Sequence, residues 1–184
     1  VRARRRWAGR VWQAGVGAGL VVAVFGAVSG AWGAVTHRHT GGPRWTLDGT
    51  AYLAQSSPDQ KAAFDWLNRS VPGTPVLVEA AGPSYQEFSR VSMNTGLPIV
   101  LGWEYHVFQR SQSQAAIDRR RQDIELIYTS PSQTLVAAAL ARYHAALVFV
   151  GNLERQTYRG ANLKSFRAWS DLLVPVYENP SVSI

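Results

Sequence analysis

The stretch PVLVEAAGPSYQEFSRVSMNTGLPIVLGWEYH, from Pro75 to His106, contains two short apolar runs, and polar side chains follow each of them directly. The runs cover residues 76–78 and 98–101. A third run, residues 146–150, is followed by the sequence Gly-Asn-Leu-Glu-Arg. Short apolar runs bounded by turn residues are typical of strands that are buried on both faces of a sheet. The sequence therefore predicts three neighbouring parallel strands in an α/β domain.

Side chains suited to ligand binding follow the carboxyl ends of all three predicted strands. Ligands of open α/β sheets bind beyond those ends, so we expect one rim to gather seven side chains: Glu79, Tyr85, Arg90, Trp103, His106, Glu154 and Arg155. Guanidinium groups bind phosphate in a bidentate manner, and aromatic rings stack on sugars. An anionic or sugar-like ligand therefore suits Tyr85, Arg90, Trp103, Arg110 and Arg155. Alternatively, Arg90 and Arg155 pair with the nearby Glu87 and Glu154.

The segment between the first two strands predicts a helix from Ser84 to Asn94. Ser84 and Glu87 have the spacing of a capping box, in which the two side chains satisfy backbone N–H groups at a helix start. A nucleophilic role for Ser84 is the alternative, but the Gly-x-Ser-x-Gly motif of hydrolases does not surround it.

His106 is expected in a polar loop that follows the second strand, two residues after Glu104. A histidine in such a loop acts as a general base or a metal ligand, or it simply forms a loop hydrogen bond. No paired metal-ligand motif occurs in the sequence, and it contains no cysteine, so no self-contained metal site is predicted.

Further helices are expected around the sheet, starting at residues 57–59 and covering residues 112–128, 133–143 and part of 160–169. Residues 174–179 and 181–184 predict a terminal hairpin that turns at Asn179-Pro180. The expected fold is a small Rossmann-like three-layer domain with a mixed, mainly parallel sheet and a C-terminal hairpin.

The net charge of +7 is concentrated at the amino end, where five arginines occur within residues 1–10, leaving 7 − 5 = +2 for the rest. Next to them, residues 11–36 contain no charged side chain. A helix of this length measures about 39 Å, enough to cross a hydrocarbon core of about 30 Å. Arginines before such a span place the amino end in the cytoplasm. The alternative of a nucleic-acid-binding arm is less favoured, and no nucleic-acid partner is expected.

The predicted organisation is a basic cytoplasmic flank at residues 1–10, a transmembrane helix at 11–36, a linker at 37–46 and an extracytoplasmic α/β domain at 47–184. Glycines four residues apart, at positions 15 and 19 and at 26 and 30, favour close contact with other membrane helices. The chain begins with Val1. We therefore expect it to be the tail of a longer membrane protein, and not a complete single-pass protein, with the lipid bilayer and upstream helices as partners.

Several motifs taken together resemble the carboxyl-terminal region of the YYY-type multispanning membrane proteins of prokaryotes, an uncharacterised family that looks like the GT-C glycosyltransferases. The motifs are Leu47-Asp48-Gly49-Thr50-Ala51-Tyr52-Leu53, Trp66-Leu67-Asn68, Val78-Glu79-Ala80 with Ser84-Tyr85, Arg90-Val91-Ser92 with Thr95-Gly96-Leu97-Pro98, Leu101-Gly102-Trp103 with His106, Asp123-Ile124 with Ile127-Tyr128-Thr129, and Val150-Gly151 with Leu153-Glu154-Arg155. The match covers roughly residues 47–184 and the preceding membrane helix. It departs from the family pattern after His106, where Val107 stands in place of an acidic residue and Phe108-Gln109-Arg110 replaces a Trp-Arg pair.

The resemblance implies a parent glycosyltransferase that uses a polyprenyl-phosphate sugar donor and carries its catalytic acid in an upstream loop. A divalent cation is possible in that parent, whereas no cofactor is expected in this chain. The fragment would contribute donor or acceptor contacts and be inactive alone. A non-enzymatic extracytoplasmic binding or assembly domain is the alternative. An enzyme should place the strand-end residues around an open pocket, whereas a structural domain should bury them in mutual ion pairs.

Overall fold

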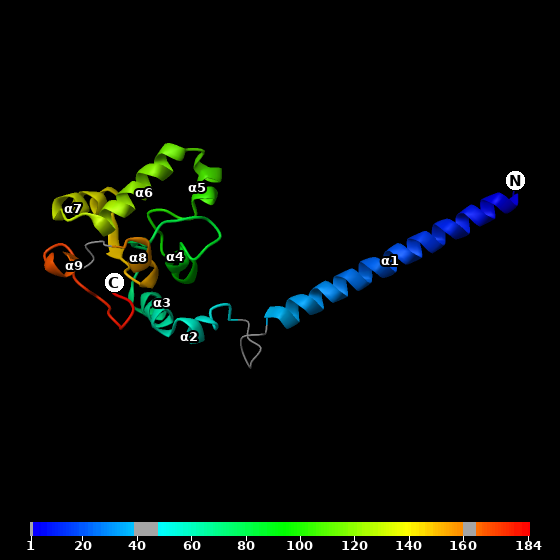
Figure 1. Ribbon diagram of the computed structural model, residues 1–184, viewed down its shortest axis with the longest axis horizontal. Coiled ribbons are helices and arrows are strands. Elements are labelled where there is room, and N and C mark those ends of the chain that lie inside the picture. The colour runs from blue at the N-terminus through cyan, green and yellow to red at the C-terminus, as the bar shows by residue number, and fades with distance from the viewer. Residues whose placement is uncertain (1, 39–47, 160–164) are drawn as a thin grey trace. The chain divides into compact units, whose positions relative to one another are not determined.

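The computed structural model describes residues 2–38, 48–159 and 165–184. Two compact units make up the chain, Val1–Tyr52 and Leu53–Ile184, and each is described by itself (Figure 1). Most of the expected linker, from residue 39 onward, lies outside the described residues, as does the start of the helix expected within residues 160–169.

The first unit contains one long helix, α1, which covers Arg2–Arg38. Within its segment Gly9–Thr36, an 18-residue window has a mean hydropathy of 1.9, and none of that window is buried in the unit. The Thr36 hydroxyl donates a hydrogen bond of 2.9 Å to the Trp32 carbonyl oxygen, so this polar side chain is satisfied within the helix. The expected apolar helix is confirmed, and it is long and apolar enough to cross a membrane.

A small parallel sheet forms the centre of the second unit. Strand β1, Val76–Val78, pairs in parallel with β2, Ala145–Val148. Ile99 pairs with Leu77 on the other edge of β1, and Val150 pairs antiparallel with Ser183. The expected parallel arrangement is therefore present, but the second predicted strand is reduced to one bridge. Proline has no N–H, and here Pro98 contributes only its carbonyl oxygen, which accepts from Leu77 N–H at 2.8 Å.

Helices surround this sheet and make the unit mainly helical (Figure 1). They are α2 Leu53–Ser56, α3 Pro58–Ser70, α4 Arg90–Thr95, α5 Glu104–Ser111, α6 Gln114–Thr129, α7 Gln133–Arg142, α8 Asn152–Thr157 and α9 Ser165–Ala168. Ser113 and Ser132 cap α6 and α7 by accepting hydrogen bonds from the N–H groups of Ala116 and Leu135. The expected helices near residues 58, 114 and 133 are confirmed, and α8 was not expected.

The core consists of two clusters of buried apolar side chains. One contains Val78 and Val148 of the strands together with Ile117, Ile124 and Ile127 of α6. The other contains Leu77 and Phe149 together with Phe64 and Leu67 of α3. Neighbouring strand residues fall into different clusters because side chains alternate between the faces of a strand. Both faces of the small sheet are therefore covered.

The helix expected from Ser84 to Asn94 is wrong in its first half, because α4 begins only at Arg90. Tyr85 and Ser89 have positive φ angles of 64° and 67°, which a right-handed helix does not allow. The Ser84 hydroxyl accepts a hydrogen bond from Tyr105 N–H at 3.1 Å, so it caps no helix of its own. Correspondingly, the polar loop expected around His106 is the first turn of α5.

The expected terminal hairpin is confirmed by its backbone hydrogen bonds. Ile184 N–H donates to the Tyr177 carbonyl oxygen at 2.9 Å, and Asn179 N–H donates to that of Val182 at 2.9 Å. Asn179 also accepts from Ser181 and Val182 through its side-chain oxygen, which is a common way to stabilise a turn.

Candidate functional site

The seven residues predicted for one rim form three separate groups. Glu79, Arg90 and Glu154 lie in the interior and contact one another; we call them the buried triad. Another group, which we call the aromatic cluster, consists of Tyr85, Trp103 and His106 near the surface. Arg155 belongs to neither group. Its guanidinium donates to the Ser181 carbonyl oxygen, and its side chain lines a cavity beside β2.

Arg90 lies at the centre of the buried triad. Its Nη1 and Nη2 atoms lie 3.1 and 2.6 Å from the two carboxylate oxygens of Glu154, a bidentate pair. Its Nη1 also lies 3.6 Å from Glu79 Oε2, and its Nε donates to Gln60 Oε1 at 3.0 Å. The exposed fractions are 2% for Glu79, 5% for Arg90 and 0% for Glu154. All three groups are thus removed from solvent.

Backbone N–H groups donate further hydrogen bonds to both carboxylates. Glu79 accepts from Val91 and Ser92 in the first turn of α4, at 3.1 Å each. Glu154 accepts from Ala80 at 3.0 Å and from Gly151 at 2.8 Å. The buried triad therefore joins the chain after β1, the start of α4 and the start of α8, and it satisfies N–H groups that would otherwise be buried without a partner.

Burial raises the pKa of Glu79 from 4.5 to about 7, because removal from water disfavours the charged carboxylate more than Arg90 and the two N–H groups favour it. The triad contains two carboxyl groups and one guanidinium, so full ionisation leaves one negative charge in the interior. The raised pKa allows Glu79 to take up a proton near neutral pH.

Gly151 is packed tightly against the buried triad. A Cβ atom at this position would lie 2.9 Å from Phe149 Cε1 and 3.2 Å from Arg90 Nη2. The Arg90 guanidinium also lies 5.3 Å from the centre of the Phe149 ring, within reach of a cation–π interaction. A side chain at position 151 would press on the Phe149 ring and on the Arg90–Glu154 ion pair, and glycine avoids both contacts.

The aromatic cluster has a different character. Tyr85 and Trp103 have ring centres 5.2 Å apart, and His106 meets them edge-on at 5.2 and 5.4 Å. His106 Nε2 lies 3.0 Å from the Tyr85 hydroxyl, and Trp103 Nε1 donates to the Phe88 carbonyl oxygen at 2.6 Å. Tyr85 is 68% exposed. The cluster therefore exposes the Tyr85 ring to solvent, whereas Trp103 and His106 are half-buried and held in place by their contacts.

Local backbone geometry positions the aromatic cluster. Tyr85 has φ of 64°, a left-handed conformation that is uncommon outside glycine, asparagine and aspartate. Trp103 and His106 are three residues apart at the start of α5, so their side chains lie on one face of that helix. The Ser84–Tyr105 hydrogen bond fixes the turn that carries Tyr85 to the same helix.

The acidic residue nearest His106 in sequence is occupied elsewhere. Glu104 accepts hydrogen bonds from Arg121 Nε at 2.6 Å and Nη2 at 2.7 Å. Among the described residues, no three His, Cys, Asp or Glu side chains gather closely enough to hold a metal ion. The arrangement around His106 therefore suits contact with a neutral polar ligand better than proton transfer assisted by a carboxylate.

Neither local ion pair considered from the sequence is present, because Arg90 and Arg155 both have other partners. Arg90 pairs with Glu154, which is 64 residues away, and not with Glu87. Arg155 does not take Glu154 as its partner, because Arg90 occupies that carboxylate. Sequence reasoning also missed Gln60 as a partner of Arg90, and nothing in its helical surroundings signals that role.

Neither the family models nor the curated proteins nor the solved structures with which the chain was compared match it.

Proposed function

We propose that this chain is a membrane-anchored carbohydrate-binding domain, without a catalytic group of its own, of a GT-C-like membrane glycosyltransferase. The aromatic cluster carries this proposal. Carbohydrate rings present flat C–H faces that pack on exposed aromatic rings, and their hydroxyls need a few well-placed polar partners. Tyr85 and Trp103 provide the rings, and His106 and the Tyr85 hydroxyl provide the partners.

We assign no catalytic role to this domain because of how three of its acidic residues are used. Glu79 and Glu154 are buried in ion pairs and backbone hydrogen bonds, and Glu104 is paired with Arg121. A general base must reach the proton that it removes. Glu79 and Glu154 are buried, and Glu104, which is partly exposed, is held by Arg121.

The wider setting of the proposal rests on the membrane helix and on the resemblance to the YYY-type proteins. In the proposed setting, the amino end is cytoplasmic and the α/β domain is extracytoplasmic. The apolar clusters on both sheet faces support a Rossmann-like three-layer arrangement of that domain. The parent protein uses a polyprenyl-phosphate sugar donor, and any divalent cation is bound in its upstream part.

A non-enzymatic assembly domain is the second candidate, and the buried triad favours it. Strand-end residues that would line an open pocket in an enzyme are instead enclosed in mutual ion pairs. Under this reading the triad only holds α4 and α8 to the sheet, and the aromatic cluster binds no sugar.

The test measures sugar binding by the full chain in lipid nanodiscs, using saturation-transfer NMR with a panel of methyl glycosides and a short-chain polyprenyl-phosphate sugar. We expect at least one glycoside to bind. Tyr85→Ala should weaken the binding of that glycoside at least tenfold, because a ring face is lost. Tyr52→Ala removes a tyrosine that is similarly exposed, at 65%, and serves as the matched control. Equal binding by both variants, or no binding by any sugar, would favour the assembly candidate.

A further inference from the structure

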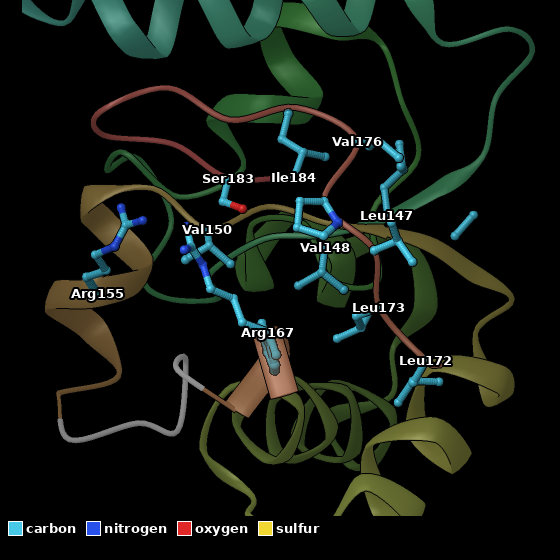
Figure 2. A pocket seen from close by; sticks show the side chains of 14 residues that line it. Leu147, Val148, Val150, Arg155, Arg167, Leu172, Leu173, Val176, Ser183 and Ile184 are labelled. Carbon is cyan, nitrogen blue, oxygen red and sulfur yellow. The ribbon is translucent and has the colours of Figure 1, made fainter. Parts of the chain in front are cut away.

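A cavity of about 450 Å³ lies between β2 and the segment of residues 172–176 (Figure 2). Val148 lines one side, and Leu172, Leu173 and Val176 line the other, while Ser183 and Ile184 lie at one end. Its volume falls in the range of ligand pockets, and its lining is mostly aliphatic. The proposed function makes no use of this cavity.

The edge of β2 that faces the cavity has backbone groups available for pairing. Val78 pairs with Val148, and Phe149 N–H donates to the Val78 carbonyl oxygen at 2.9 Å. Because neighbouring residues of a strand direct their backbone groups to opposite edges, the N–H and C=O of Val148 face away from β1. On that edge, the backbone hydrogen bonds formed within the described residues are the two between Val150 and Ser183, at 2.9 and 3.0 Å.

The terminal hairpin provides a second edge on the opposite side of the cavity. Ile184 pairs with Tyr177, and Val176 N–H donates to the Ile184 carbonyl oxygen at 2.8 Å. Within the described residues, the ladder of this hairpin extends to Val176 and no further toward Val174. An antiparallel strand that continued the direction of Ser183 and Ile184 would therefore lie between Val148 and Val174.

We propose that this cavity binds one extended peptide strand of another polypeptide, which adds antiparallel to the edge of β2. Backbone hydrogen bonds would give affinity, as in other cases of strand addition to a sheet edge. A purely apolar ligand would leave the N–H and C=O of Val148 without partners, which costs free energy in a site where Val148 is only 7% exposed.

The lining defines the chemistry of the partner strand. Val148 belongs to one core cluster and Leu147 packs against the other, so an added strand meets apolar surroundings on both faces and should be rich in β-branched residues. Arg155 and Arg167 lie at the end near Val150 and Ser183, where an antiparallel strand begins (Figure 2). Glu178 pairs with Arg167, so Arg155 supplies the net positive charge there and favours an acidic first residue.

The experiment uses the full chain in lipid nanodiscs and the probe peptide acetyl-Glu-Val-Ile-Val-Thr-amide. Binding is measured by isothermal titration calorimetry, and exchange of the Val148 amide hydrogen by NMR. The first control peptide has the same side chains but carries N-methyl groups at alternate residues, which removes hydrogen-bond donors. We expect the unmethylated peptide to slow Val148 exchange at least tenfold and to bind at least tenfold more tightly than the methylated one.

A pair of variants separates the cavity from the general surface. Val174→Glu places a charge at the cavity and should weaken peptide binding at least tenfold. Leu135→Glu changes an apolar residue of α7 and should leave peptide binding unchanged. The two positions are similarly exposed, with exposed fractions of 67% for Val174 and 52% for Leu135. Equal binding of methylated and unmethylated peptides would overturn the proposal. It would also be overturned if laurate displaced the peptide and the exchange rate of the Val148 amide hydrogen did not change. Absence of peptide binding up to millimolar concentration would also overturn it.

Discussion

The buried triad and the aromatic cluster are both built from residues that follow predicted strands, yet they have opposite relations to solvent. Glu154 is 0% exposed and pairs with Arg90, whereas Tyr85 is 68% exposed and contacts its neighbours through ring edges and one hydrogen bond. A buried charge needs a partner to offset the free energy of its desolvation, but an aromatic ring can keep one face in contact with water at little cost in free energy. The difference indicates that the triad stabilises the fold, whereas the cluster stays partly open to solvent, as the proposed binding role requires.

The largest expected effect on stability comes from Arg90→Met. It leaves two carboxyl groups buried without their cation, which typically costs about 3–5 kcal/mol. Urea unfolding followed by far-UV circular dichroism measures this in the full chain. Arg167→Met is the control, because Arg167 pairs with Glu178 at the surface and contributes less than about 1 kcal/mol. Similar losses in the two variants would remove the distinction between the buried triad and a surface ion pair.

The second effect is a dependence of stability on pH that arises from Glu79. Its pKa is raised from 4.5 to about 7 by burial, so the folded state binds a proton more tightly than the unfolded state. The contribution of Glu79 is therefore greatest below pH 4.5 and is lost as the pH rises to about 7, a change on the order of 3 kcal/mol. Unfolding between pH 4.5 and 8 should show a smaller slope in Glu79→Gln than in the unchanged protein.

Glu87→Gln is the control for this titration, because Glu87 is exposed and lies outside the buried triad. It should keep the slope of the unchanged protein. If Glu79→Gln also kept that slope, the protonation of Glu79 would not be linked to folding, and the triad would be fully ionised across this pH range.

Gly151→Ala should have an intermediate effect. The added methyl group meets Phe149 at 2.9 Å and the Arg90 guanidinium at 3.2 Å, and overpacking of this kind costs about 1–3 kcal/mol. At Gly102 an added Cβ would lie 3.8 Å from Val107, an ordinary contact, so Gly102→Ala should change stability by less than about 0.5 kcal/mol. Thermal unfolding of both variants compares them directly, and a tolerated Ala at position 151 would mean that the triad is loosely packed.

Tyr85→Ala should have the smallest effect on stability, less than about 1 kcal/mol, because most of its ring is in solvent. The same urea unfolding measures it. A loss comparable to that of Arg90→Met would show that the aromatic cluster is a structural support, and it would weaken the case for a ligand-binding surface.

Local patterns predicted much of the secondary structure. The expected helices at residues 133–143 and 112–128 correspond to α7, which Ser132 caps, and to α6, whose buried face includes Ile117, Ile124 and Ile127. Both signals are short-range, because capping groups and helix faces involve residues a few positions apart. The prediction failed from Ser84 to Ser89, where a capping pattern was present but the serine hydroxyl bonds to Tyr105, 21 residues away.

The candidate site was predicted as a set of residues but not as an arrangement. Polar residues after apolar strands indicated which side chains matter. Their division into a buried group and an exposed group depended on the left-handed turn at Tyr85 and on α5 beginning at Glu104. Neither feature has a sequence signal of its own, since tyrosine rarely adopts positive φ and the strand-to-helix junction contains no clear cap.

The sequence by itself determined the apolar helix at the amino end, the apolar strand runs and the identity of the polar residues that follow them, because these depend on composition and on periods of a few residues. Only the tertiary structure decided that Arg90 pairs with Glu154 across 64 positions and that Tyr85, Trp103 and His106 meet at the surface. Pairing of buried charges depends on which chain segments the packed core brings together, and that is a property of the whole fold.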